Sequence, residues 1–134
     1  MKMLLLEVKR DGDTAYLTPR IVSVKSGEHE LEQFYGLLDC DTIDIVTDTI
    51  NGKEFDLIVD DEGLLTQREP SYLTSDGRVL VGNILFCHND GNGATTGIDK
   101  EDVDLLSVQL ALNAEKLNSY FERLRAKRDV RRDA

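Results

Sequence analysis

The chain has 134 residues, 40% of them hydrophobic and 31% charged, a balance typical of a globular protein. Its 26 acidic and 16 basic residues give a net charge of -10, which disfavours direct binding to nucleic acid or to an anionic membrane. No apolar run approaches the ~20 residues that a membrane-spanning helix needs. The two cysteines fit neither a disulfide framework nor a zinc motif. We therefore expect a soluble, cytoplasmic protein.

Two strands and a helix are predicted in the first 40 residues. The apolar run from Met3 to Val8 predicts a strand, and Asp11-Gly12-Asp13 predicts the turn that follows it. The looser alternation from Tyr16 to Val24 can pair back on that strand, at an edge, because Pro19 has no N–H to donate. From Glu28 to Leu38, apolar residues recur at spacings of three and four, which predicts a helix with one apolar face.

A hairpin is the clearest local signal in the middle of the chain. Asn51-Gly52 separates two β-rich runs, Ile43–Val46 and Phe55–Val59, and this dipeptide favours a two-residue turn between paired strands. The stretch from Leu64 to Leu73 is predicted to be a loop or short turn. The run from Val79 to Cys87 is predicted to be one buried strand.

A long amphipathic helix is predicted from Asp99 onward. Asp99 and Asp102 have the spacing of an N-cap and a first-turn acidic residue. Some 28 helical residues would span about 42 Å, more than the body of a domain with a radius of gyration of about 14 Å can cover. We therefore predict that the stripe mediates self-association, most simply as a two-fold homodimer. The predicted interface residues are Leu110, Asn113, Leu117, Tyr120 and Leu124.

These elements predict an α+β fold: a small, mostly antiparallel sheet, one helix packed on it and a long C-terminal amphipathic helix. Residues 1–98 form an acidic α+β body, and residues 99–134 form the long helix with a basic end. Up to residue 114 the chain carries a net charge of -13, whereas residues 115–134 carry +3. The basic end suits a helix C-terminus, where the macrodipole is negative, and it could also contact an acidic partner or the body of a second copy.

The middle of the chain resembles a known family. The stretches Leu31–Val46, with FYGLLDC and IDIV, and Ile50–Leu65, with the strand end DDEG, resemble the uncharacterised domain-of-unknown-function family 3846 of phage, plasmid and other mobile-element genes. Gly82–Phe86 and Thr96–Asp102 also fit this family, so the resemblance covers about residues 31–106. It implies a compact α+β fold and a mobile-element setting. It implies no activity, cofactor or catalytic residue, and the helix beyond Leu106 departs from the usual short end of the family.

No catalytic residue, metal site or cofactor is predicted. Cys87 and His88 are neighbours on a predicted strand, so their side chains should point to opposite faces and cannot form a dyad. A calcium loop starting at Asp90 fails at two central positions, which hold Ala94 and Thr95. We expect a plain loop between strand and helix there.

The hypothesis for function rests on an acidic stretch between Asp39 and Glu62. Asp44 and Asp56 fall between apolar residues, which predicts that a hairpin presents carboxylates on one solvent face. Such a face could bind a basic surface of a host defence protein, or it could serve only solubility and protection of a sheet edge. The predicted protein-binding residues are Asp44, Asp48, Glu54, Asp56, Asp60, Asp61 and Glu62. We therefore expect a non-enzymatic phage or mobile-element accessory protein.

An alternative is an oligomeric small-molecule-binding protein that sequesters a nucleotide signal. Backbone amides at Gly91 and Gly93 would bind the anionic ligand, together with the guanidinium groups of Arg123 and Arg125. The loop and the arginines lie at opposite ends of the long helix. Both groups could therefore reach one ligand only across a dimer.

Overall fold

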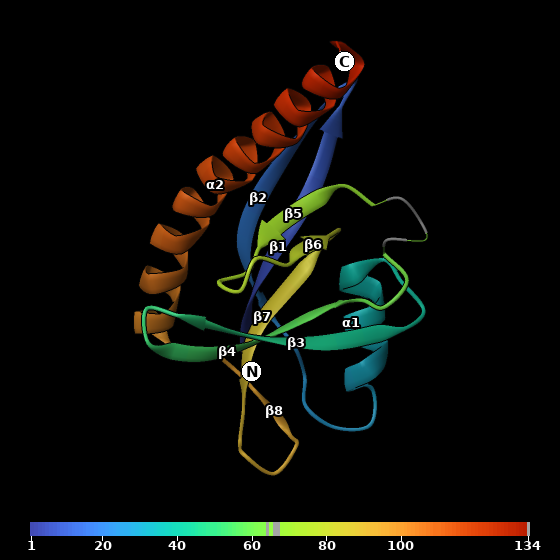
Figure 1. Ribbon diagram of the computed structural model, residues 1–134. Coiled ribbons are helices and arrows are strands. Elements are labelled where there is room, and N and C mark those ends of the chain that lie inside the picture. Colours follow the sequence, from blue (N-terminus) through green and yellow to red (C-terminus); the bar gives the residue numbers. More distant parts are fainter. Residues whose placement is uncertain (64, 66–67, 134) are drawn as a thin grey trace.

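The computed structural model describes residues 1–63, 65 and 68–133, with residues 128–133 as helical backbone only. Strands dominate the first hundred residues, and one long helix follows them (Figure 1). The elements of this described part are, in chain order, β1 (Lys2–Asp11), β2 (Thr14–Ser23), α1 (Glu30–Leu38), β3 (Ile43–Ile50), β4 (Lys53–Asp60), β5 (Pro70–Leu73), β6 (Val79–Val81), β7 (Ile84–Asn89), β8 (Thr95–Thr96) and α2 (Lys100–Asp133).

The main sheet is antiparallel, with the strand order β2-β1-β7-β4-β3 and with β8 paired to β7. Strands β5 and β6 form a second, two-stranded sheet. The central strand β7 comes late in the chain and fills the gap between the two earlier hairpins. This architecture confirms the predicted α+β fold with a mostly antiparallel sheet, a short helix and a long C-terminal helix.

Both predicted hairpins form. Strands β1 and β2 pair without a break from Lys2 opposite Ser23 to Asp11 opposite Thr14. In the β3–β4 hairpin, Asn51 and Gly52 have φ angles of 51° and 80°. Positive φ at both loop positions is what a type I′ turn requires, and this explains why Asn-Gly predicts the hairpin so well.

Side chains alternate between two buried faces along the central strands. One face packs against α2 and the β5–β6 sheet, through a cluster that joins Leu4, Leu57 and Phe86 to Tyr72 and Leu106. The other face packs against α1, through a cluster that joins Leu5, Ile58 and Leu85 to Phe34 and Leu38. The two helices therefore cover opposite faces of the sheet, and the core has two layers.

Two predicted segments differ from the structure. The loop expected from Leu64 to Leu73 contains strand β5, although residues 64, 66 and 67 lie outside the described residues. The single strand expected from Val79 to Cys87 is divided into β6 and β7, because Gly82 turns the chain with a φ of 74°. The side chain of Asn83 fixes this break: its Oδ1 accepts from the Val8 amide at 2.9 Å, and its Nδ2 donates to the Leu37 carbonyl at 3.1 Å.

Helix α2 has 34 residues and is therefore about 51 Å long. The body covers more of it than expected, because the long β1–β2 ribbon extends beside it (Figure 1). A hollow of about 300 Å³ between the two is lined by Leu17 of β2 and by Leu117 and Phe121 of α2. Within the described residues, no helix is long and apolar enough to cross a membrane.

Candidate functional site

The predicted acidic residues of the β3–β4 hairpin do not share one face. Along β3, Asp44 and Asp48 lie on the same face as Val46, which packs in the core on the α2 side. Along β4, Asp56 lies on the same face as Ile58, which packs on the α1 side. The expected single face of carboxylates is therefore wrong: the register places even-numbered residues of β3 opposite odd-numbered residues of β4, as in Asp44 opposite Val59, so acids at even positions on both strands lie on opposite faces of the sheet.

Asp48 is a buried structural carboxylate, only 4% exposed. It accepts a hydrogen bond from the Tyr72 hydroxyl at 3.1 Å and another from the Ser75 amide at 3.0 Å. Burial, and after it the nearby Asp48 carboxylate, raises the pKa of Tyr72 well above its ordinary value. Asp48 thus joins the edge strand β3 to β5 and the turn after it, and it is not available to a partner protein.

Asp56 and Asp60 are also buried. Asp56 accepts from the Asn89 side chain at 3.0 Å, and Asp60 accepts from the Glu62 amide at 2.9 Å. The Arg68 guanidinium lies 3.3 Å from Asp60 and contacts Asp39 as well. The prediction that Asp56 and Asp60 belong to an exposed binding face is therefore wrong, because both carboxylates hold elements of the fold together.

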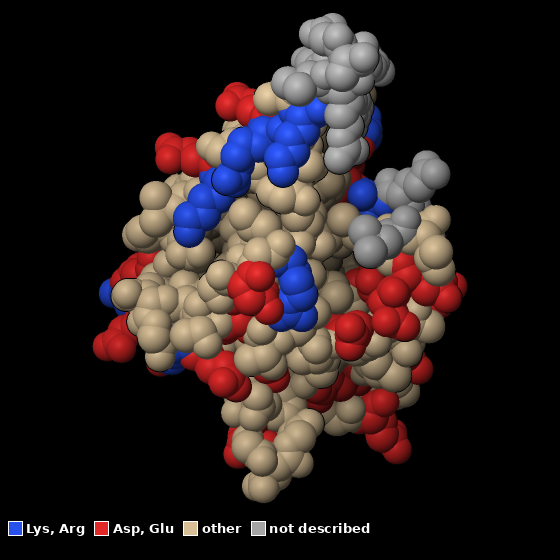
Figure 2. Space-filling view, in the orientation of Figure 1, with Lys and Arg blue, Asp and Glu red and all other residues tan. Residues whose placement is uncertain are grey.

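The exposed carboxylates gather at the open end of the β3–β4 hairpin, opposite its turn. The Asp61 amide donates to the Thr42 carbonyl at 3.1 Å, which joins the segments before β3 and after β4. In Figure 2 these acidic side chains lie on the right of the view, where β3 begins and β4 ends. We call this surface the acidic end; its exposed residues are Asp39, Asp41, Asp44, Asp61 and Glu62. Glu54, the remaining predicted residue, is exposed near the turn at the other end.

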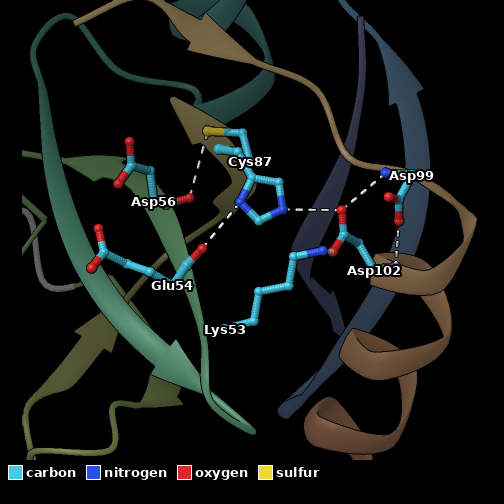
Figure 3. Close-up of polar contacts among 7 residues, drawn as sticks. Lys53, Glu54, Asp56, Cys87, Asp99 and Asp102 are labelled. Carbon is cyan, nitrogen blue, oxygen red and sulfur yellow. Dashed lines mark hydrogen bonds and ion pairs between the residues drawn. The ribbon is translucent and has the colours of Figure 1, made fainter. Parts of the chain in front are cut away.

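A polar cluster around His88 lies where β4, β7 and α2 meet, and Figure 3 shows the residues that surround it. The Nδ1 of His88 faces the Glu54 carbonyl at 3.0 Å, and its Nε2 faces the Asp102 carboxylate at 3.0 Å. The imidazole stacks on the Phe55 ring, with a centroid separation of 4.5 Å. Lys53 donates to the same carboxylate. Cys87, the residue before His88, belongs to the core on the α1 side, so the side chains of these two neighbours point to opposite faces of the sheet.

Asp102 also caps α2. Its amide donates to the Asp99 side chain at 2.8 Å, and its carboxylate accepts from the Asp99 amide at 3.0 Å, which is a reciprocal capping box. This confirms the N-terminus that the spacing of the two aspartates predicted. The sequence did not reveal that His88 completes the cluster, because the histidine lies 14 residues before Asp102 and comes from another element.

Hydrogen bonding shifts the pKa values of two groups in this cluster, Asp102 and Lys53. Burial alone would raise the pKa of Asp102, but the bonds from Lys53, the Asp99 amide and His88 together hold it below its ordinary value. The same bond to Asp102 raises the pKa of Lys53. Burial raises the pKa of the Cys87 thiol to about 12, so that thiol is a poor nucleophile. The side chains of His88 and Lys53, both from the sheet, contact the Asp102 carboxylate of α2, so the cluster joins the sheet to the helix.

The alternative anion site is not assembled within one chain. The Gly91 amide donates to Asn89 at 2.8 Å, and the Asn92 and Ala94 amides both donate to Asp90. Side chains of the loop thus occupy amides that a phosphate would need. In Figure 1 this loop, between β7 and β8, lies at the opposite end of the molecule from the C-terminal end of α2, which carries Arg123 and Arg125. No group of His, Cys, Asp or Glu among the described residues could hold a metal ion.

The predicted interface stripe is largely part of the protein's own core. Asn113 is 1% exposed; its Nδ2 donates to the Leu73 carbonyl at 2.8 Å, and its Oδ1 accepts from the Leu73 amide at 3.2 Å. Leu117 is buried, and Leu110 packs against the core. The interpretation of these three residues as a contact between copies is therefore corrected. Tyr120 is half-buried and Leu124 is exposed, and self-association itself stays a prediction.

One comparison with known proteins gives a match. The sequence model of the family DUF3846, described as a domain of unknown function, matches residues 2–111. The match runs from β1 through about the first third of α2 and is wider than the resemblance in the middle of the chain indicated. Neither the curated proteins nor the solved structures gave a match. The chain therefore belongs to the DUF3846 family.

Proposed function

We propose that this DUF3846 protein is a non-enzymatic, cytoplasmic accessory protein of a phage or other mobile element, and that its acidic end binds a basic surface on a host defence protein. The observation that carries the proposal is the gathering of five exposed carboxylates at the open end of one hairpin, in a chain with a net charge of -10. Arg68, which lies among them, is already paired with Asp39 and Asp60.

The segments that carry these carboxylates also carry exposed apolar side chains. Ile45 of β3 is 50% exposed, and Leu65 in the segment after β4 is 83% exposed. Stable interfaces place apolar side chains near the centre of a contact and charges around it, where the charges act mainly on the rate of encounter. The β3–β4 hairpin and the segment after it supply both kinds of side chain, with Ile45 on the sheet face opposite Asp44.

A binding role also agrees with the chemistry of the His88 cluster. A general base must be able to reach a proton on a substrate. Both ring nitrogens of His88 instead face oxygen atoms of the fold, those of Glu54 and Asp102. The cluster therefore supports the position of α2 and is not part of the proposed interface.

The test compares two triple variants with equal changes in charge. Asp41→Asn, Asp44→Asn and Asp61→Asn neutralise the acidic end. Asp11→Asn, Asp13→Asn and Asp104→Asn neutralise exposed carboxylates elsewhere and serve as the control. Each purified protein is immobilised and incubated with a lysate of host cells. The captured proteins are quantified by mass spectrometry. We expect a basic protein that is captured by wild type and the control and lost from the first variant.

A second measurement uses that captured protein in purified form. Its association rate with wild type should fall as added salt shortens the Debye length, and the variant of the acidic end should show a flatter salt dependence. Equal capture by both triple variants, or equal salt dependence, would contradict the proposal.

A further inference from the structure

The face of α2 that packs on the body continues beyond the point where the body covers it. Leu106, Leu117 and Leu124 lie on one helical face, at spacings of 11 and 7 residues. Leu106 is fully buried and Leu117 is 5% exposed, but Leu124 is 40% exposed. The described residues from Glu122 to Lys127 are all exposed. An apolar stripe that begins as core thus ends as surface.

A hollow of about 480 Å³ lies on this uncovered part of the helix. Among the described residues, Tyr120, Leu124 and Ala126 supply apolar lining, and Arg123 and Lys127 also line it. Figure 2 shows lysine and arginine side chains along this end of α2, away from the acidic end. Such a surface fits an apolar side chain flanked by carboxylates, because it offers dispersion contacts and two cations at once.

We propose that this hollow, the basic end of α2, docks on the acidic end of a second copy of the chain. The acidic end carries the complementary charges in Asp44, Asp61 and Glu62, and exposed apolar side chains come from the same segments: Ile45 of β3, on the sheet face opposite Asp44, and Leu65 after β4. The two surfaces lie on different parts of the molecule (Figure 1), so the contact forms between copies.

Charge selects this arrangement over a pairing of two helix ends. A two-fold contact centred on Leu124 would bring Arg123 and Lys127 of both copies together, and like charges across an interface are unfavourable. Docking helix end on acidic end pairs opposite charges instead. Since each copy carries both surfaces, two such contacts can form reciprocally about a two-fold axis.

This inference rests on the proposed function, because it names a second occupant of the acidic end. A basic host protein and the helix of a second copy would bind the same carboxylates. The host protein should therefore displace the second copy, and self-association should weaken when the host protein is present.

The test is a charge swap followed by light scattering at low salt. Arg123→Glu with Lys127→Glu reverses the helix end, and Asp44→Lys with Asp61→Lys reverses the acidic end. We expect wild type to associate, and each reversed variant to lose at least about tenfold in affinity for itself. Mixing the two variants, or joining all four changes in one chain, should restore association.

Every substituted side chain is exposed, and thermal unfolding checks that each variant folds. If a variant does not fold, the salt dependence of wild-type association replaces it. Wild type that stays a single copy at high concentration and low salt would overturn the inference, as would association that neither reversal weakens. A single-copy protein that still captures its host partner through the acidic end would leave the proposed function standing. Association that follows the charge swap, together with no captured host protein, would support the inference and contradict the proposed function.

Discussion

The two halves of α2 carry the same spacing of apolar residues but have different surroundings. The first half is tied to the sheet by the His88 cluster, by Leu106 in the core and by Asn113, whose amide pairs with both backbone groups of Leu73. The second half leaves the body after Phe121, and Leu124 meets solvent. Spacing therefore decides which face of a helix is apolar, but the other elements of the fold decide how far that face is buried.

The largest expected effect comes from truncating the same residue type in the two halves. Leu106→Ala should lower the free energy of unfolding by about 2–5 kcal/mol, because it opens a cavity among fully buried side chains. Leu124→Ala, its matched control, should cost less than about 1 kcal/mol, as surface substitutions usually do. Urea unfolding measures both. Equal losses would show that the end of α2 is covered in solution.

Asn113 provides the next comparison. Asn113→Ala should cost about 1–3 kcal/mol, because the amide and carbonyl of Leu73 lose their partners where water has little access. Asn118→Ala, in the exposed part of the next turn, should change the free energy of unfolding by less than about 0.5 kcal/mol. If Asn113 instead served a contact between copies, its substitution would change the molecular mass in light scattering and leave the stability of the single copy unchanged.

Asp102 tests how the first half is anchored. Asp102→Ala removes the half of the capping box that accepts from the Asp99 amide, and it removes the shared partner of Lys53 and His88. It should cost about 1–2 kcal/mol. Asp104→Ala removes an exposed carboxylate from the same turn and serves as the control. Similar losses for the two variants, measured by urea unfolding, would contradict the role assigned to the cluster.

The local parts of the fold are predictable from the sequence, and the reason is physical. Asn51-Gly52 specifies its own turn through the two positive φ angles, and Asp99 and Asp102 specify a capping box through their spacing. Each signal is complete within a few residues. The α+β class follows from such signals together.

The candidate site is less predictable, because burial depends on distant partners. The strand predicted over Ile43–Val46 stops before Asp48, and the sequence does not show that Tyr72, 24 residues later, covers that carboxylate. Strand β5 has only four residues and no periodicity to indicate it. Whether a carboxylate such as Asp48 stays exposed therefore depends on where the second sheet lies, and local sequence signals do not give that position.

The smallest effect is a pH dependence that separates the anchored half of α2 from the free half. Because the pKa of Asp102 is lower in the folded chain than in the unfolded chain, its ionisation stabilises the fold. This contribution is complete above the ordinary carboxyl pKa of about 3.9 and is lost as pH falls through the lower folded value. Urea midpoints of wild type and Asp102→Ala should therefore differ at neutral pH and converge in acid. Lys53 acts in the opposite direction: its pKa is raised, so its contribution persists below its ordinary value and is lost only as strongly alkaline pH passes through the folded value. The urea midpoint of Glu122→Ala, in the exposed part of α2, should differ from that of wild type by a constant amount across the acid range. If that difference also disappeared in acid, Asp102 would not be the cause of the pH dependence.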